Sequence, residues 1–198
     1  MVSAWIKKND KWGFIDKTGK EITSCIYDDV SYFSEGLACV RKNDKFGFVD
    51  KTGKEVIPCI YDRAEEFCEG LAWVNKNDKF GFIDKMGKEV ISCIYDDAYN
   101  FEEGLAEVQK SGYWGFIDKT GKEIVPCIYD DVGVFREGLA DVKKNGYWGY
   151  IDETGKEVIP CIYDRVGSFC EGLAKIEKDG KWGFIDKTGT EVVSCVYE

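Results

Sequence analysis

A glycine that follows a large aromatic residue recurs at a fixed interval along the whole 198-residue chain. The glycines are Gly13, Gly47, Gly81, Gly115, Gly149 and Gly183, each 34 residues after the one before it. The residues in front of them are Trp12, Phe46, Phe80, Trp114, Trp148 and Trp182. Such a period predicts a tandem array in which each unit contacts its neighbours. We therefore expect a single domain of six repeats, at approximately 1–35, 36–69, 70–103, 104–137, 138–171 and 172–198.

The residues within one repeat favour strands over helices. A period of 34 residues is also that of helical tetratricopeptide arrays. Gly47 would interrupt any helix through the second repeat, at about 1 kcal/mol, and the same glycine recurs in every repeat. The segments LACV, FGFVD and EVIPCIY are rich in β-branched and aromatic residues, and Asn-Asp, Asn-Gly or Asp-Gly pairs follow the first segment in most repeats. Because such pairs favour two-residue hairpins, we predict three antiparallel strands and a connector, YDxxxxFxEG.

Both faces of the predicted sheet are apolar. Along the middle strand Phe46 and Phe48 point to one side, while Val49 points to the other and Gly47 leaves room for close approach. A three-stranded sheet of this kind needs a neighbour on each face. We therefore predict an all-β fold of three-stranded units stacked in an open twisted array, with the aromatic–glycine positions in the core. A closed six-unit, propeller-like ring is the alternative, although propeller blades usually take about 40 to 45 residues.

Three motifs carry a family resemblance that covers essentially the whole chain. They are (W/F)-G-(F/Y)-(I/V)-D-x-x-G, E-(V/I)-(I/V/T)-(P/S)-C-(I/V)-Y and F-x-E-G-L-A. Together they resemble the WG-containing repeat, also called the KWG repeat. The departures are Phe46 and Phe80 in place of tryptophan, and Met86 in place of the usual threonine. The resemblance implies a β-rich architecture, a mainly bacterial family and a binding role, with no shared catalytic residue.

The residues that enzymes and metal sites use are scarce. The chain has no histidine and no CxxC pair. It therefore lacks the usual ligands of structural zinc and the usual general base of enzymes. Six of the nine cysteines occupy one repeat position, about 10 to 14 Å from one repeat to the next in a stacked array, which is too far for disulfides. The recurrent aspartate of the YD pair is interpreted as a turn former that bonds nearby backbone amides. We expect no enzymatic activity, no metal and no cofactor.

Charge and hydropathy limit the partners. The net charge of −10 argues against nucleic acid, which needs clustered Lys and Arg. No apolar run has the length of a membrane span, and the first residues lack a secretory signal. We expect a cytoplasmic protein that does not insert into membranes. A surface location stays open if the chain is a fragment.

The positions that differ between repeats are the candidate binding residues, because repeated positions build the core. Two such positions lie two residues apart on the first strand, on one side of it, and the connector varies as well. The candidates are Trp5, Lys7, Tyr32, Cys39, Arg41, Trp73, Asn75, Tyr99, Glu107 and Asp141. A variable but passive surface is one interpretation of these positions.

The main functional hypothesis is a non-catalytic scaffold that binds a protein partner through this variable face, because exposed aromatics are usual interface anchors. The alternative is a structural or cell-surface module that recognises glycan or envelope material. Self-association through the terminal repeats is also left open.

Overall fold

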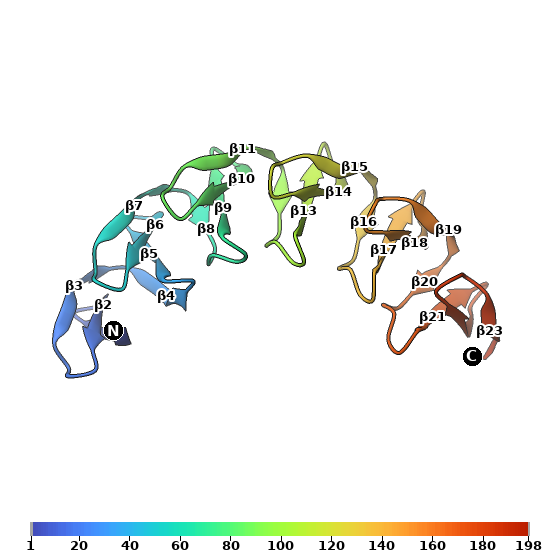
Figure 1. Cartoon of the computed structure of the whole chain (residues 1–198), viewed down its shortest axis with the longest axis horizontal. Coiled ribbons are helices and arrows are strands. Elements are labelled where there is room, and N and C mark those ends of the chain that lie inside the picture. Colours follow the sequence, from blue (N-terminus) through green and yellow to red (C-terminus); the bar gives the residue numbers. More distant parts are fainter. Residues whose placement is uncertain (1, 198) are drawn as a thin grey trace. The chain divides into compact units, whose positions relative to one another are not determined.

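The computed structural model describes residues 2–197, and across them the chain forms 23 strands and no helix (Figure 1). The first strand of each repeat, strand A, is β1 (Val2–Lys8), β5 (Leu37–Lys42), β9 (Leu71–Lys76), β13 (Leu105–Lys110), β17 (Leu139–Lys144) or β21 (Leu173–Lys178). Strand B is β2 (Lys11–Asp16), β6 (Lys45–Asp50), β10 (Lys79–Asp84), β14 (Tyr113–Asp118), β18 (Tyr147–Asp152) or β22 (Lys181–Asp186). Strand C is β3 (Glu21–Tyr27), β7 (Glu55–Tyr61), β11 (Glu89–Tyr95), β15 (Glu123–Tyr129), β19 (Glu157–Tyr163) or β23 (Glu191–Tyr197).

The connector between repeats contributes a further strand that the sequence did not predict. These connector strands are β4 (Asp29–Ser34), β8 (Arg63–Ala64), β12 (Asp97–Ala98), β16 (Asp131–Val132) and β20 (Arg165–Val166). The first sheet is β1-β2-β3, and the other five have four strands in an order such as β4-β5-β6-β7. Asp29 pairs with Arg41, and Val30 with Val40, so the connector satisfies the backbone groups at the outer edge of strand A. The prediction of an all-β fold of tandem antiparallel sheets is confirmed.

The turns follow the predicted chemistry. Between β5 and β6, Asn43 and Asp44 have φ angles of 53° and 59°, as a two-residue hairpin of the primed type requires. Between β6 and β7, Gly53 has a φ angle of 83°, and its amide donates to the carbonyl of Asp50 at 2.9 Å. The side chain of Asp50 accepts the amide of Thr52 at 2.8 Å, which fixes this turn from inside.

The strand-B glycine allows strand C to bulge across it. Phe46 pairs with Tyr61, and Phe48 with Ile57, so the register shifts between these two pairs. A Cβ atom on Gly47 would lie 2.5 Å from the carbonyl oxygen of Ile57. A side chain at this position would therefore collide with the bulged backbone of β7.

Contacts divide the chain into two compact units, Met1–Ala106 with Lys119–Gly121, and Glu107–Asp118 with Lys122–Glu198. Each unit holds stacked repeats with two apolar faces, as predicted. In the first unit one core cluster joins the second and third repeats, through Leu37, Cys39, Phe48, Ile57, Tyr61, Phe67, Ala72, Val74 and Ile83. The opposite face of the second repeat packs on the first repeat, through Phe14, Tyr27, Ala38, Val40 and Val49. In the second unit the corresponding cluster is Leu139, Tyr150, Ile159, Tyr163, Phe169, Ala174, Ile176 and Ile185. The open array, with a closed ring as the alternative, stays a prediction.

An aromatic pair links each strand B to the connector that follows it. The ring centroids of Phe48 and Phe67 lie 4.9 Å apart at an interplanar angle of 63°. Pairs of the same kind are Phe14–Phe33, Phe82–Phe101, Phe116–Phe135 and Tyr150–Phe169. Edge-to-face pairs add to the burial of the two rings, so the connector phenylalanine belongs to the core.

The predicted core positions are buried to different extents. All six strand-B glycines are buried. Of the aromatic residues in front of them, Phe80 is buried, whereas Trp12, Phe46, Trp114, Trp148 and Trp182 are partly exposed. In the first five repeats the residue after the glycine, as in Phe48 with an exposed fraction of 0%, is buried more deeply, whereas Phe184 in the sixth repeat is 39% exposed. The tryptophan of the motif therefore lies at the margin of the core.

Candidate functional site

The prediction that the variable positions of strand A face solvent is wrong for Cys39 and Asn75. Their exposed fractions are 7% and 5%. The amide of Cys39 donates to Ser31 Oγ at 3.0 Å, and the Cys39 thiol lies 3.8 Å from the carbonyl oxygen of Ala64 in the next connector. The connectors on both sides therefore cover a position that varies freely in sequence.

Four further candidates on strand A are partly buried: Arg41, Trp73, Glu107 and Asp141. The ring of Trp73 packs against Phe80 with centroids 5.3 Å apart. Burial raises the pKa of Asp141, and the nearby carboxylate of Asp131 raises it further. None of these four side chains is fully presented to solvent. In the connector, Tyr99 is 54% exposed.

The remaining candidates gather at one place in the first compact unit. The rings of Trp5 and Trp12 meet edge to face with centroids 4.8 Å apart, and Tyr32 lies 6.1 Å from Trp5. The ammonium of Lys7 lies 5.4 Å from the centre of the Trp12 ring, within the range of a cation–π contact. We call Trp5, Lys7, Trp12 and Tyr32 the aromatic cluster. Because Trp5 is 39% and Tyr32 71% exposed, the cluster offers open aromatic surface beside the ammonium of Lys7, which also pairs with Asp10 at 3.3 Å.

Cys39 and Cys59 do not resemble catalytic thiols. All nine cysteines are free. Burial raises the pKa of Cys39 to about 12 and that of Cys59 to about 11, with nearby carboxylates adding to the effect. Because the thiolate is the nucleophilic form, these two side chains are held in their unreactive state at neutral pH. Among residues 2–197 no group of three or more Cys, Asp or Glu side chains could hold a metal ion.

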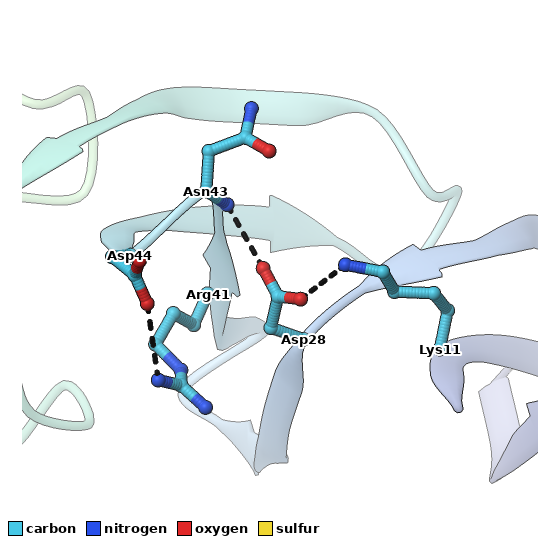
Figure 2. Close-up of polar contacts among 5 residues, drawn as sticks. All are labelled: Lys11, Asp28, Arg41, Asn43 and Asp44. Atoms are coloured by element: carbon cyan, nitrogen blue, oxygen red, sulfur yellow. Dashed lines mark hydrogen bonds and ion pairs between the residues drawn. The ribbon is translucent and has the colours of Figure 1, made fainter.

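The recurrent aspartate of the YD pair, predicted to be a turn former that bonds nearby backbone amides, bonds an amide of the next repeat and so joins two repeats. In Figure 2, Lys11 donates to one oxygen of Asp28, and the amide of Asn43 donates to the other at 2.9 Å. Asn43 belongs to the A–B hairpin of the next repeat. The pKa of Asp28 is lowered, first by the Lys11 hydrogen bond and then by the Asn43 amide. Asp62 binds Lys45 and the amide of Asn77 in the same way, and Lys79 pairs with Asp96.

A family model described as the WG containing repeat matches residues 12–46, 46–80, 80–114, 114–148, 148–182 and 182–198. The chain belongs to the WG-containing repeat family. The predicted family is therefore confirmed, and the WG dipeptide is the strand-B position described above. None of the curated proteins compared with this WG-repeat chain matches it.

The WG-repeat chain also matches solved structures, at low identity. Hsv2 of Kluyveromyces lactis is 11% identical, with a TM-score of 0.46 over 80% of this chain and 58% of that one. A eukaryotic initiation factor is 11% identical, with a TM-score of 0.51 over 98% of this chain and 65% of that one. The chain thus spans less than two thirds of either protein. These neighbours are β-propeller-like, and the likeness concerns the fold alone.

A second carboxylate links the WG repeats through the F-x-E-G motif. Glu35 accepts the amide of Gly70 at 3.0 Å and the ammonium of Lys85 at 2.9 Å. The pKa of Glu35 is lowered, with the Lys85 hydrogen bond as the largest cause. Glu69 and Glu137 have equivalent partners, in Gly104 with Lys119 and in Gly172 with Lys187. Each of these glutamates fixes the connector turn of the following repeat.

These carboxylates predict a loss of stability in acid. Asp28, Asp62 and Glu35 have lowered pKa values, so the folded chain binds fewer protons than the unfolded chain. Their contribution is fully present above the unfolded pKa values, near 4, and is lost as the pH falls through the lower folded values. We expect the melting temperature, followed by circular dichroism, to be level from about pH 7 to about pH 5 and to fall below about pH 4.

A matched pair of variants tests the source of this acid sensitivity. Asp62→Asn removes one clamp and should reduce the difference in melting temperature between neutral and acid solution. Asp78→Asn changes an exposed aspartate of a nearby hairpin and should follow the wild type. A wild-type melting temperature that does not change with pH, or two variants that respond alike, would contradict this origin.

No helix in the part of the chain that the structure describes has the length and apolar character of a membrane span.

Proposed function

We propose that this WG-repeat chain is a non-catalytic scaffold that binds a protein partner through the aromatic cluster. The observation that carries the proposal is the exposure of Trp5 and Tyr32, at 39% and 71%, on antiparallel sheets. Tryptophan and tyrosine are the residues on which binding energy concentrates in protein interfaces, because they bury a large area with few rotatable bonds. Lys7 adds a charge at the margin of the aromatic surface, where it can select an acidic or polar rim.

The sequence supports a binding role over a catalytic one. The chain has no histidine, and its carboxylates recur from repeat to repeat as clamps that are already engaged by lysines and amides. The fold supplies a uniform core under positions that differ between repeats, which is the arrangement that repeat proteins use for recognition.

The proposal is tested by quantitative affinity capture from a lysate of the source organism, read by mass spectrometry. The baits are the wild type, the double variant Trp5→Ala/Tyr32→Ala and the control Met86→Ala, which removes an isolated side chain that is 84% exposed. We expect at least one protein to be retained by the wild type and the control, and to be reduced at least about tenfold on the double variant. Circular dichroism checks that every bait is folded.

Two results would contradict the proposal. Equal retention by all three baits would show that the aromatic cluster is not the binding surface. Capture of carbohydrate by the wild type, with no specific protein, would instead favour a module that recognises glycan, for which exposed aromatic rings are equally suited.

A further inference from the structure

The fifth repeat lacks one member of the lysine–aspartate clamp. In the first three repeats a lysine at the start of strand B, namely Lys11, Lys45 or Lys79, donates to the aspartate that follows strand C. Figure 2 shows the first of these clamps. The fifth repeat keeps the aspartate, as Asp164, but has Tyr147 at the position of the lysine.

Asp164 is otherwise held as in the complete clamps. One of its oxygens accepts the amide of Asp179, in the next hairpin, at 2.7 Å. This contact matches the one between Asp28 and the amide of Asn43. Among the ion pairs of residues 2–197, none involves Asp164. The carboxylate is therefore positioned for an ammonium group that its own repeat does not supply.

A groove of about 400 Å³ lies beside this carboxylate. It is lined by Tyr147, Cys161, Ile162, Asp164, Lys178 and Asp179, all within the second compact unit. Tyr147 is 49% and Ile162 43% exposed, so the groove has an apolar wall that solvent reaches. An apolar wall next to the carboxylates of Asp164 and Asp179 suits a ligand with a hydrocarbon stem and a cationic end.

We propose that this groove binds a lysine side chain of a partner polypeptide, whose ammonium group takes the place that Lys11, Lys45 and Lys79 occupy in their own repeats. Asp164 would accept a charge-assisted hydrogen bond from the ammonium, and the Tyr147 ring and Ile162 would contact the methylene stem. The net charge of −10 favours a basic partner segment.

Lys178, in the wall of the groove, has a counterpart at the complete clamps that already hold an ammonium group. Lys178 precedes the hairpin that donates to Asp164, and Lys42 holds the same position beside the complete clamp of Asp28. An ammonium group therefore binds next to that lysine position in the first repeat already. The groove belongs to the second compact unit and the aromatic cluster to the first, so the two binding proposals stand independently.

The test is a titration followed by nuclear magnetic resonance of the full chain labelled at isoleucine methyl groups. The probe is the peptide acetyl-Gly-Lys-Gly-amide, and its norleucine analogue is the matched control without the charge. We expect the lysine peptide to shift the Ile162 methyl signal in a saturable way, and the norleucine peptide to leave it unchanged. Asp164→Asn should weaken binding about tenfold.

Two further variants separate the groove from general attraction to an acidic protein. Tyr147→Lys supplies the missing lysine in cis and should abolish binding, and it should fold because lysine is native at this position in four repeats. Glu153→Gln removes a charge outside the groove lining and should bind as the wild type does. The proposal is overturned if Ile162 does not respond, if both peptides act alike, if Tyr147→Lys still binds, or if Asp164→Asn and Glu153→Gln weaken binding equally.

Discussion

Replacing Phe48 with alanine is expected to lower the free energy of unfolding by about 4 kcal/mol. The exposed fraction of Phe48 is 0%, and its ring packs edge to face on Phe67 with centroids 4.9 Å apart. Truncation leaves a cavity between the second and third repeats, which the backbone of two sheets cannot close. Urea unfolding followed by circular dichroism measures the loss.

The chain carries its own control for this variant. Phe184 occupies the same repeat position, but 39% of it is exposed. Phe184→Ala should therefore cost about 2 kcal/mol or less, because more than a third of the residue is already exposed and no closed cavity forms. Equal losses from the two variants would contradict the idea that the aromatic pair of strand B and its connector is a main source of stability.

The second large effect is expected at a strand-B glycine. In Gly149→Ala the new Cβ atom would lie 2.5 Å from the carbonyl oxygen of Ile159 and 2.6 Å from the carbonyl carbon of Pro160. Both are backbone atoms of the bulge in β19, so neither can rotate away. We expect a loss of about 3 kcal/mol, at the upper end for overpacking, and a fall in melting temperature of about 6 to 12 °C.

Gly167→Ala is the matched control in the same compact unit. Its Cβ atom would meet nothing closer than the Cβ atom of Lys175 at 3.8 Å, which is an ordinary contact. This substitution should leave the melting temperature unchanged or raise it slightly, because alanine restricts the unfolded chain. A Gly149→Ala protein as stable as the control would show that strand C does not need to approach strand B closely.

The elements that local chemistry controls could be predicted from the sequence. The period of 34 residues identified the repeats, Asn43-Asp44 identified a hairpin, and Gly47 marked a close approach of backbone. Each of these features depends on residues adjacent in the chain or on repetition itself. The connector strands were missed because strands of two residues, such as β16, have no pattern of their own and form only because strand A offers an edge.

The candidate binding residues could be predicted only in part, because variability was used as a sign of exposure. Cys39 and Asn75 vary between repeats yet both are buried, and the connectors that cover Cys39 follow a path that the sequence does not reveal. Tyr61 and Phe67 were not singled out, although the same residues recur through the repeats and both are buried. Repetition was the signal that could have placed them in the core. The cluster of Trp5 with Tyr32 required the fold, since 27 residues separate them in the chain.

The most direct test of the proposed scaffold is the dissociation constant of the captured partner, purified and measured by calorimetry against three forms of the chain. These are the wild type, Trp5→Ala and Met86→Ala. If the aromatic cluster is the binding surface, Trp5→Ala should weaken binding about thirtyfold, the loss of about 2 kcal/mol that marks an interface anchor, and Met86→Ala should bind as the wild type does. An unchanged dissociation constant for a folded Trp5→Ala protein would contradict the account.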